Sequence, residues 1–381
     1  MRRPLILLLL LTPLVAGGPL TASRGGEAKA RALKARGGGE ATEKAVAAAL
    51  DWLAAHQEAE GHWDADGFDA SAGCDCDGKG GGWHGEPVPC ALDREVTALA
   101  TLAFLGAGHS HREGAHRERV QRALDWLAAG IGEGTLFAIA YATQALAEVY
   151  DRTGDEGYLP AIRTGIRTMV ESRQSQGGWR YFVGCTMASG VPTTTAVVCA
   201  LERAAAAGID VDPGYREPML AWLRSLMDRE SGKVRYTVDA DALGYTPTTT
   251  NAASALLIHS LLRIPSSDER IRLGLSALAK QRPKWSIRFK RMKVRGEMRD
   301  VQIGYLQHYY WHHGTEALAR LGGDAWTAWN AALKKALLPH QRTDGHAKGS
   351  WDPVGTYGNV GGRVFSTALC AMMLESYYRY P

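Results

Sequence analysis

The stretch WLAAHQEAEGHW, residues 52–63, closes an apolar, Ala-rich segment with a Gln, a turn that contains a Gly, and a Trp. The segment that leads into it, AALDWLAAHQ (48–57), returns almost unchanged as RALDWLAAGI (122–131). Both copies carry apolar residues at helical spacing. The chain therefore repeats a helix followed by a turn, and this repeat is the strongest guide to its fold.

The same order of Gln, short turn and Trp recurs along the chain. The pairs are Gln57 with Trp63, Gln174 with Trp179, Gln281 with Trp285, and Gln341 with Trp351. We interpret the Gln as closing a helix C-terminus, the Gly as permitting the turn, and the Trp as packing back on the hairpin. The pattern thus predicts a structural device and no catalytic role.

Each of these helices is followed by a second one that is richer in Ala and Thr. The second set covers about 93–107, 135–151, 193–207, 248–263, 302–321 and 363–378. Small residues let helices approach closely, which predicts an inner layer, whereas the more charged first set predicts an outer layer. Six hairpins can curve until the last packs on the first. We therefore expect an all-α (α/α)6 toroid rather than an open solenoid.

The N-terminus has the features of a secretory signal. Arg2 and Arg3 precede an apolar run at 5–15 that is too short for a comfortable membrane span. We expect a signal peptide at 1–22, export to the periplasm or exterior, a flexible Gly-rich leader at 23–40, and the toroid at 41–381. An uncleaved N-terminal anchor is the alternative.

Composition gives few hints about partners. The 381 residues include 45% hydrophobic side chains, and the formal net charge is only +4, so we expect no nucleic acid partner. The stretch 282–299 is dense in Lys and Arg and alternates in its apolar residues, which predicts a basic β-like arm. Such an arm could contact a membrane surface, although a solvated arm is the simpler interpretation.

The motif Q-x-x-x-G-x-W at 57–63 resembles the repeat of squalene-hopene and oxidosqualene cyclases. The stretch GSWDPVGTYGNVGGRVFSTALCAMMLESYYRY (349–380) resembles the last repeat of bacterial cyclase-like toroid proteins and the end of thioester domains. The chain is thus similar to the terpenoid cyclase and protein prenyltransferase superfamily, in its secreted bacterial form. The resemblance implies a toroid with a central cavity.

The catalytic motifs of that superfamily are missing. No D-x-D-D proton donor occurs, because Asp239-Ala240-Asp241 is followed by Ala, and the zinc residues of prenyltransferases do not map. Cys185 lacks the surrounding sequence of a thioester. We therefore expect a protein that binds an apolar or extended ligand, a glycan or a partner protein. A divergent terpenoid cyclase or transferase, and a carbohydrate-active enzyme, are the alternatives.

Several residues are candidates for the cavity wall. Tyr305, His308, Tyr309 and His312 share one helical stripe, and an aromatic and imidazole wall suits a polyprenyl chain or a sugar. Further candidates at the junctions of loops and helices are Glu95, Asp352, Tyr357 and Arg363. A cyclase with a divergent acid would have a deep aromatic cavity that holds one buried carboxyl group.

The insertion at 71–90 gathers Cys74, Cys76, His84 and Cys90 in a Gly-rich loop. These residue types can hold zinc tetrahedrally, although the spacing is not that of a common zinc motif. A disulfide from Cys90 to Cys74 or Cys76, with one thiol left over, is the alternative that export favours. No other cofactor is expected.

Overall fold

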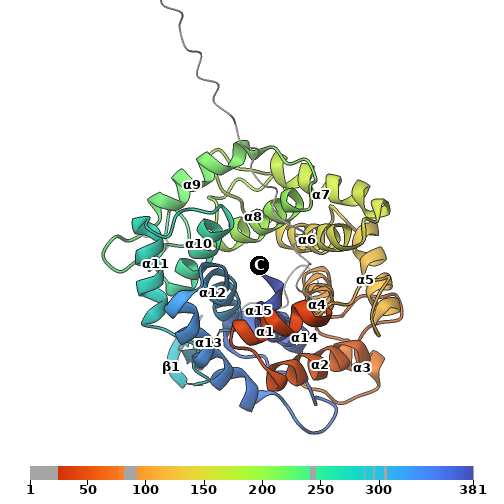
Figure 1. The fold of residues 1–381 in the computed structure, drawn as a ribbon. Coiled ribbons are helices and arrows are strands. Elements are labelled where there is room, and N and C mark those ends of the chain that lie inside the picture. The colour runs from red at the N-terminus through yellow and green to blue at the C-terminus, as the bar shows by residue number, and fades with distance from the viewer. Residues whose placement is uncertain are drawn as a thin grey trace, which may run out of the picture.

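The computed structural model describes residues 25–80, 92–240, 246–286, 288–294, 297–303 and 307–380. Two concentric rings of helices surround one axis (Figure 1). The outer ring consists of α2 (Glu40–Ala55), α5 (Arg117–Ala129), α7 (Leu159–Glu171), α9 (Arg216–Ser225), α11 (Glu269–Ala279) and α13 (Gly323–Leu337). The inner ring consists of α4 (Asp93–Ala107), α6 (Leu136–Thr153), α8 (Val191–Ala206), α10 (Thr249–Leu261), α12 (His308–Leu321) and α14 (Gly355–Leu374).

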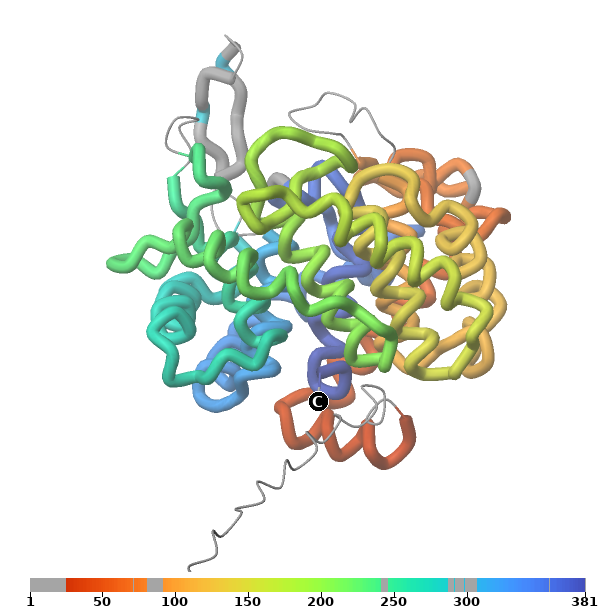
Figure 2. Tube along the Cα trace, turned by 90° about the horizontal axis from the view of Figure 1, so that it is seen from above, coloured from red at the N-terminus to blue at the C-terminus, as the bar shows by residue number. Residues whose placement is uncertain are grey.

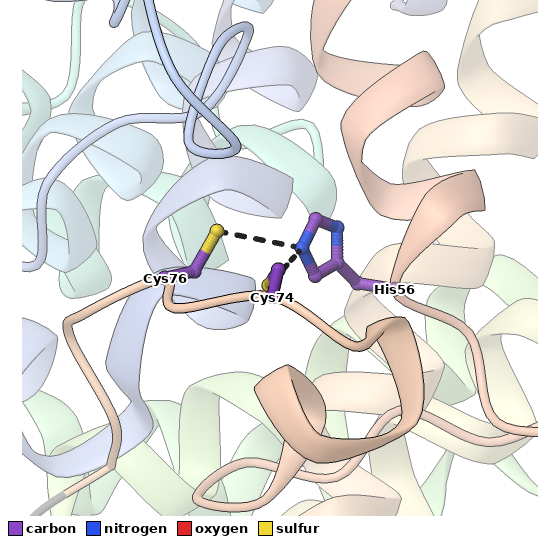
Figure 3. Close-up of side chains that lie close together, drawn as sticks. All are labelled: His56, Cys74 and Cys76. Atoms are coloured by element: carbon purple, nitrogen blue, oxygen red, sulfur yellow. Dashed lines mark hydrogen bonds between the residues drawn. The ribbon is translucent and has the colours of Figure 1, made fainter.

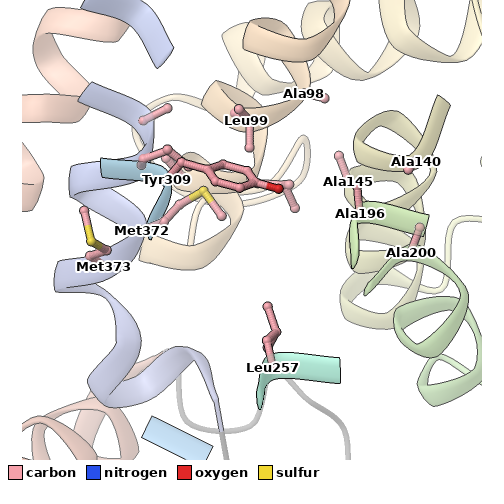
Figure 4. Close-up of a cluster of buried hydrophobic side chains, with 14 of the residues drawn as sticks. Ala98, Leu99, Ala140, Ala145, Ala196, Ala200, Leu257, Tyr309, Met372 and Met373 are labelled. Carbon is pink, nitrogen blue, oxygen red and sulfur yellow. The ribbon is translucent and has the colours of Figure 1, made fainter. Parts of the chain in front are cut away.

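The inner ring is closed. Each inner helix packs on the next one along the chain, and α14 packs back on α4. Small buried side chains make this close packing feasible, for example Ala98 on α4, Ala140 on α6 and Ala196 on α8, which appear among the buried residues of Figure 4. The predicted six-hairpin toroid is therefore confirmed.

Hydrogen bonds link the Gln–Trp pair of the first hairpin to its surroundings. The Gln57 amide donates to the carbonyl of Gly61 at 2.8 Å and to that of Arg119, on α5, at 2.9 Å. The Trp63 indole donates to the Leu53 carbonyl at 2.8 Å. Gln57 therefore closes the turn after α2 and also holds α5, the next outer helix.

The last hairpin uses the same device to close the ring. The Gln341 amide donates to the carbonyl of Gly349 at 2.7 Å and to that of Ala45, on α2, at 2.8 Å. Gly349 has a φ of +92°, and a Cβ there would lie 2.2 Å from the carbonyl oxygen of Ala48. Only glycine fits where the last turn meets the first outer helix.

The inner helices differ from their predicted bounds in the last two hairpins. Helix α12 begins at His308 rather than near 302, because strand β2 (Glu297–Ile303) pairs antiparallel with β1 (Arg288–Val294) before it. This hairpin is the predicted basic arm. Helix α14 starts at Gly355, eight residues before the predicted 363, and is broken at Gly362, whose φ is +74°.

Part of the expected flexible leader is helical. Helix α1 (Gly26–Ala35) packs against the C-terminal helix α15 (Ser376–Arg379), and Figure 2 shows the two together at one end of the ring. Lys29 forms a 2.7 Å ion pair with Glu43. The remaining short elements are α3 (Phe68–Ala72) and the 3-10 turns η2 (Glu156–Tyr158), η3 (Pro213–Tyr215) and η4 (Leu338–His340).

The predicted signal peptide at 1–22 lies outside the described residues. Within the described ranges, no helix combines the length and the apolar character needed to cross a membrane.

Candidate functional site: a central aromatic cavity

A cavity of about 330 Å³ lies where several inner helices begin. Its wall comes from the first turns of α4, α6, α12 and α14 and from the loop after Trp179. The lining side chains are mostly apolar or aromatic, as in many small-molecule sites. They are Leu92, Glu95, Val96, Thr135, Phe137, Tyr141, Tyr181, Phe182, Tyr309, Tyr357, Val360, Gly361 and Phe365.

Glu95 is the one carboxylic acid among these lining residues. Its side chain is only 8% exposed, and its Oε1 accepts a 2.6 Å hydrogen bond from the hydroxyl of Thr135. Burial raises the pKa of Glu95, and the hydrogen bond from Thr135 opposes that rise only in part. Burial in the wall therefore shifts the carboxyl group of Glu95 towards its neutral form, which can donate a hydrogen bond or a proton.

Thr135 is held in place by the helix that it begins. It is the N-cap of α6, and its hydroxyl oxygen accepts from the backbone N–H of Ala138 at 3.1 Å. The same oxygen donates its proton to Glu95. One residue thus caps an inner helix and fixes the position of the acid.

Tyrosine and phenylalanine rings form most of the remaining wall. The Tyr309 and Tyr357 rings lie 4.7 Å apart, and the Phe137 ring is 6.1 Å from each of Tyr141 and Tyr181. Among the described residues, the buried Tyr309 hydroxyl has no hydrogen-bond partner. An unpaired buried hydroxyl is costly unless a ligand supplies a partner.

A second void within the inner ring is much smaller than this cavity. Deeper in the ring, Gln144, His312, His313 and Glu316 border a void of only about 10 Å³, which holds at most one water molecule. Burial lowers the pKa of His312 to about 4 and that of His313 to about 3, so both rings are neutral near pH 7. We call the lining of this void the floor. Its other members are Leu99, Leu102, Tyr141, Ala196, Cys199, Leu257 and Met372.

Three of the eight predicted cavity residues line this cavity, namely Glu95, Tyr309 and Tyr357. His312 lies at the floor rather than on the wall. The predicted stripe breaks at its start because α12 begins at His308, and Tyr305 lies outside the described residues.

The other predicted residues have structural contacts away from the wall. His308 is buried, with its ring centroid 5.7 Å from those of Trp285 and Trp311. Arg363 is buried and donates to the carboxylate of Asp352 at 2.8 Å. This ion pair braces the turn before α14 and is not part of the cavity lining.

Sequence reasoning missed Phe137 and Tyr141 on the wall. Both lie on α6, in the hairpin that lacks the Gln–Trp pair, so the repeat pattern directed no attention to them. The available signal was their spacing of four residues at the start of an Ala-rich inner helix.

A second group of reactive side chains lies in the first hairpin. His56, Cys74 and Cys76 approach one another so that their ligand atoms all lie within 4.8 Å, and such a group could hold a metal ion (Figure 3). Cys74 and Cys76 are free thiols, which is contrary to the disulfide alternative. His84 and Cys90 lie outside the described residues, and the sequence analysis missed His56.

Comparison with solved structures shows the same toroid in proteins of different activity. An inactive variant of the GH76A α-1,6-mannanase of Salegentibacter sp. HEL1_6, in complex with α-1,6-mannotriose, matches with a TM-score of 0.60 and 11% identity, covering 89% of this chain and 99% of that chain. A variant of the type II terpene cyclase MstE from Scytonema, in complex with its substrate geranylgeranyl dihydroxybenzoate, also matches. Its TM-score is 0.56 and its identity 13%, and the match covers 89% of this chain and 97% of that chain. Lin0763 from Listeria innocua matches with a TM-score of 0.57 and 12% identity, covering 88% and 96%.

These likenesses show the α/α-toroid fold and no single activity. They confirm the toroid fold that the sequence resemblance implies, and they do not single out the squalene-cyclase repeat. No protein-family model and no curated protein sequence matches the chain.

Proposed function

We propose that the central cavity binds an apolar, extended ligand of the isoprenoid class, with neutral Glu95 donating a hydrogen bond to its one polar group. The observation that carries this proposal is the wall itself, where, among the described lining residues, aromatic and aliphatic side chains surround one buried acid. The unpartnered Tyr309 hydroxyl offers a second polar contact to such a ligand.

The loop beside the cavity supports entry of an apolar molecule. Phe182, which lines the cavity, is 50% exposed, and Val183 and Met187 in the same loop are 55% and 57% exposed. Exposed apolar residues that gather in this way mark contact sites for apolar partners.

Calorimetric titration of the purified protein with isoprenoid alcohols of increasing length tests the proposal. We expect saturable binding, abolished by Val360→Trp, which fills the cavity, and retained by Val183→Trp, which places the same ring on the exposed loop. Binding that is equal in the two variants, or binding only to mannan oligosaccharides, would refute an apolar ligand in this cavity.

A second candidate function is acid-initiated cyclisation of the same class of ligand. Glu95 is the candidate acid, because burial raises the pKa of its carboxyl group and so favours the protonated form that could protonate an alkene. The surrounding rings can stabilise the resulting cation. The terpene cyclase MstE shares the fold. Products formed from a polyprenyl substrate would separate this activity from binding alone.

Glycoside hydrolysis is a third candidate function, because a GH76 mannanase and an α-amylase share the fold. Glycoside hydrolysis ordinarily needs two carboxyl groups that flank the bond. Among the described lining residues only Glu95 has a carboxyl group, so the cavity gives this reading less support.

A further inference from the structure

The side chains of His56, Cys74 and Cys76 point three ligand atoms at one place in the first hairpin (Figure 3). His56 is the C-cap of α2, and the two cysteines lie just after α3. The His56 Nε2 atom is 3.3 Å from the Cys74 sulfur and 3.5 Å from the Cys76 sulfur. The three residues come from two separate segments and meet in a partly buried pocket outside the central cavity.

The orientation of the imidazole is that of a metal ligand. His56 Nδ1 lies 2.7 Å from the carbonyl of Trp52, so this nitrogen carries the proton and donates it. The lone pair of Nε2 then faces the two sulfurs, which is how second-shell contacts prepare a histidine for a metal. Stacking on the Trp52 ring, with centroids 4.2 Å apart, fixes the plane of the imidazole.

Hydrogen bonding alone accounts poorly for this arrangement. The single lone pair of Nε2 can accept one well-aligned hydrogen bond, yet two thiols are within reach of it. A divalent ion would accept all three electron-pair donors at once.

The spacing fits zinc. Zinc–sulfur bonds of about 2.3 Å and zinc–nitrogen bonds of about 2.0 Å, at a tetrahedral angle, place nitrogen and sulfur about 3.5 Å apart. The observed separations of 3.3 and 3.5 Å are close to that value. Two thiolates and one imidazole form a ligand set that zinc favours. We propose that His56, Cys74 and Cys76 bind one zinc ion, with water or another side chain as the fourth ligand.

The site would also fix the loop that supports one wall of the cavity. The Gly78 carbonyl, two residues after Cys76, accepts from the backbone N–H of Arg363 at 2.7 Å. The Arg363 side chain donates to the Asp77 carbonyl at 2.7 Å. Zinc at Cys76 would therefore hold the loop against α14, whose residues Val360 and Gly361 line the cavity.

Metal analysis of the full chain, purified without chelator, tests the site independently of any cavity ligand. We expect about one zinc per chain in the parent and in Cys185→Ser, a matched control whose thiol lies outside the cluster. We expect at least a tenfold loss of zinc in Cys74→Ser and in His56→Gln. Circular dichroism of each variant establishes that it is folded.

A second measurement covers the case in which a variant fails to fold. Cobalt added to the metal-free parent chain would produce the charge-transfer absorption of cobalt–thiolate bonds, and zinc would remove it. Four results would each overturn the assignment. They are a folded parent without zinc even after reconstitution, copper in place of zinc, equal zinc in all variants, and a disulfide between Cys74 and Cys76.

Discussion

The guanidinium of Arg379 lies 3.2 Å from the carboxylate of Glu148, 231 residues earlier in the chain, and both side chains are fully buried. Arg379 also pairs with Glu375 at 2.8 Å and donates to the Leu102 carbonyl at 2.7 Å. Glu148 has a second cationic neighbour in Arg203, at 3.4 Å. The C-terminal helix α15 is thus tied by charge to inner helices from the first half of the chain.

Replacing Arg379 by Met should destabilise the protein by about 3–5 kcal/mol, because the buried carboxylates of Glu148 and Glu375 would lose a cation. Urea unfolding followed by circular dichroism gives the free energy of unfolding. Arg31→Met is the control, since its pair with Glu27 is exposed and should contribute less than about 1 kcal/mol. Equal effects of the two substitutions would show that the buried network is not needed.

Closure of the ring can be tested at Gln341. Replacing it by Ala removes hydrogen bonds to Ala45 and Gly349, and should cost about 1–3 kcal/mol. Gln57→Ala removes the corresponding local bond to Gly61 and the bond to Arg119 on α5, together with a 3.2 Å bond from Arg122, and should cost at least as much. If the ring were open in solution, Gln341→Ala would lose only the local bond and would be clearly milder than Gln57→Ala.

Buried histidines should make the toroid sensitive to acid. Burial lowers the pKa of His308 to about 3, and an unfolded histidine has a pKa near 6.5. Between these values the unfolded chain binds more protons, so stability falls as the pH drops below about 6.5. Each such histidine contributes up to about 1.4 kcal/mol per pH unit.

His308→Phe should reduce that dependence. Neither ring nitrogen of His308 has a hydrogen-bond partner among the described residues, so a ring without polar atoms should be tolerated at pH 7. Unfolding free energies measured from pH 7 to pH 4 should fall less steeply in the variant than in the parent. An unchanged slope would mean that His308 is already protonated or exposed in the folded protein.

The sequence revealed the ring because its signals are local. A Gln followed within a few residues by a Trp reports one hairpin turn. Gly61 illustrates such a turn, because its φ of +103° is one that an L side chain rarely adopts. The hydrogen bonds of Gln57 and Trp63 join groups within one hairpin or between that hairpin and the next one.

The candidate sites were harder to predict because they depend on how distant helices are rotated. Glu95 and Tyr357 were named from their places at helix starts, but nothing local showed that they face one cavity together with Tyr141. His56 was missed because its partner Cys74 lies 18 residues away, across the turn and helix α3. A periodic pattern assigns a residue to a face of its helix, whereas packing in three dimensions decides what that face meets.

Glu95→Gln separates the two leading functions. An amide can donate a hydrogen bond as the neutral acid does, but it cannot transfer a proton to an alkene. If the cavity only binds its ligand, the affinity for an isoprenoid alcohol should change by less than about threefold, which is well under 1.4 kcal/mol. If the protein is a cyclase, binding should persist while product formation falls by at least about a hundredfold.

The same variant reports on the protonation state of Glu95. A carboxyl group whose pKa is raised in the folded state stabilises the protein below its unfolded pKa, and this contribution is lost as the pH rises through the folded pKa. Glu95→Gln carries no such group, so its stability relative to the parent should increase on going from pH 5 to pH 9. Thr135→Val is the companion variant, because it removes the hydrogen bond that holds the acid while leaving the acid in the wall. A relative stability of Glu95→Gln that does not change between pH 5 and pH 9 would mean that Glu95 is ionised in the folded protein throughout this range. Both proposals for the cavity would then lose their proton donor.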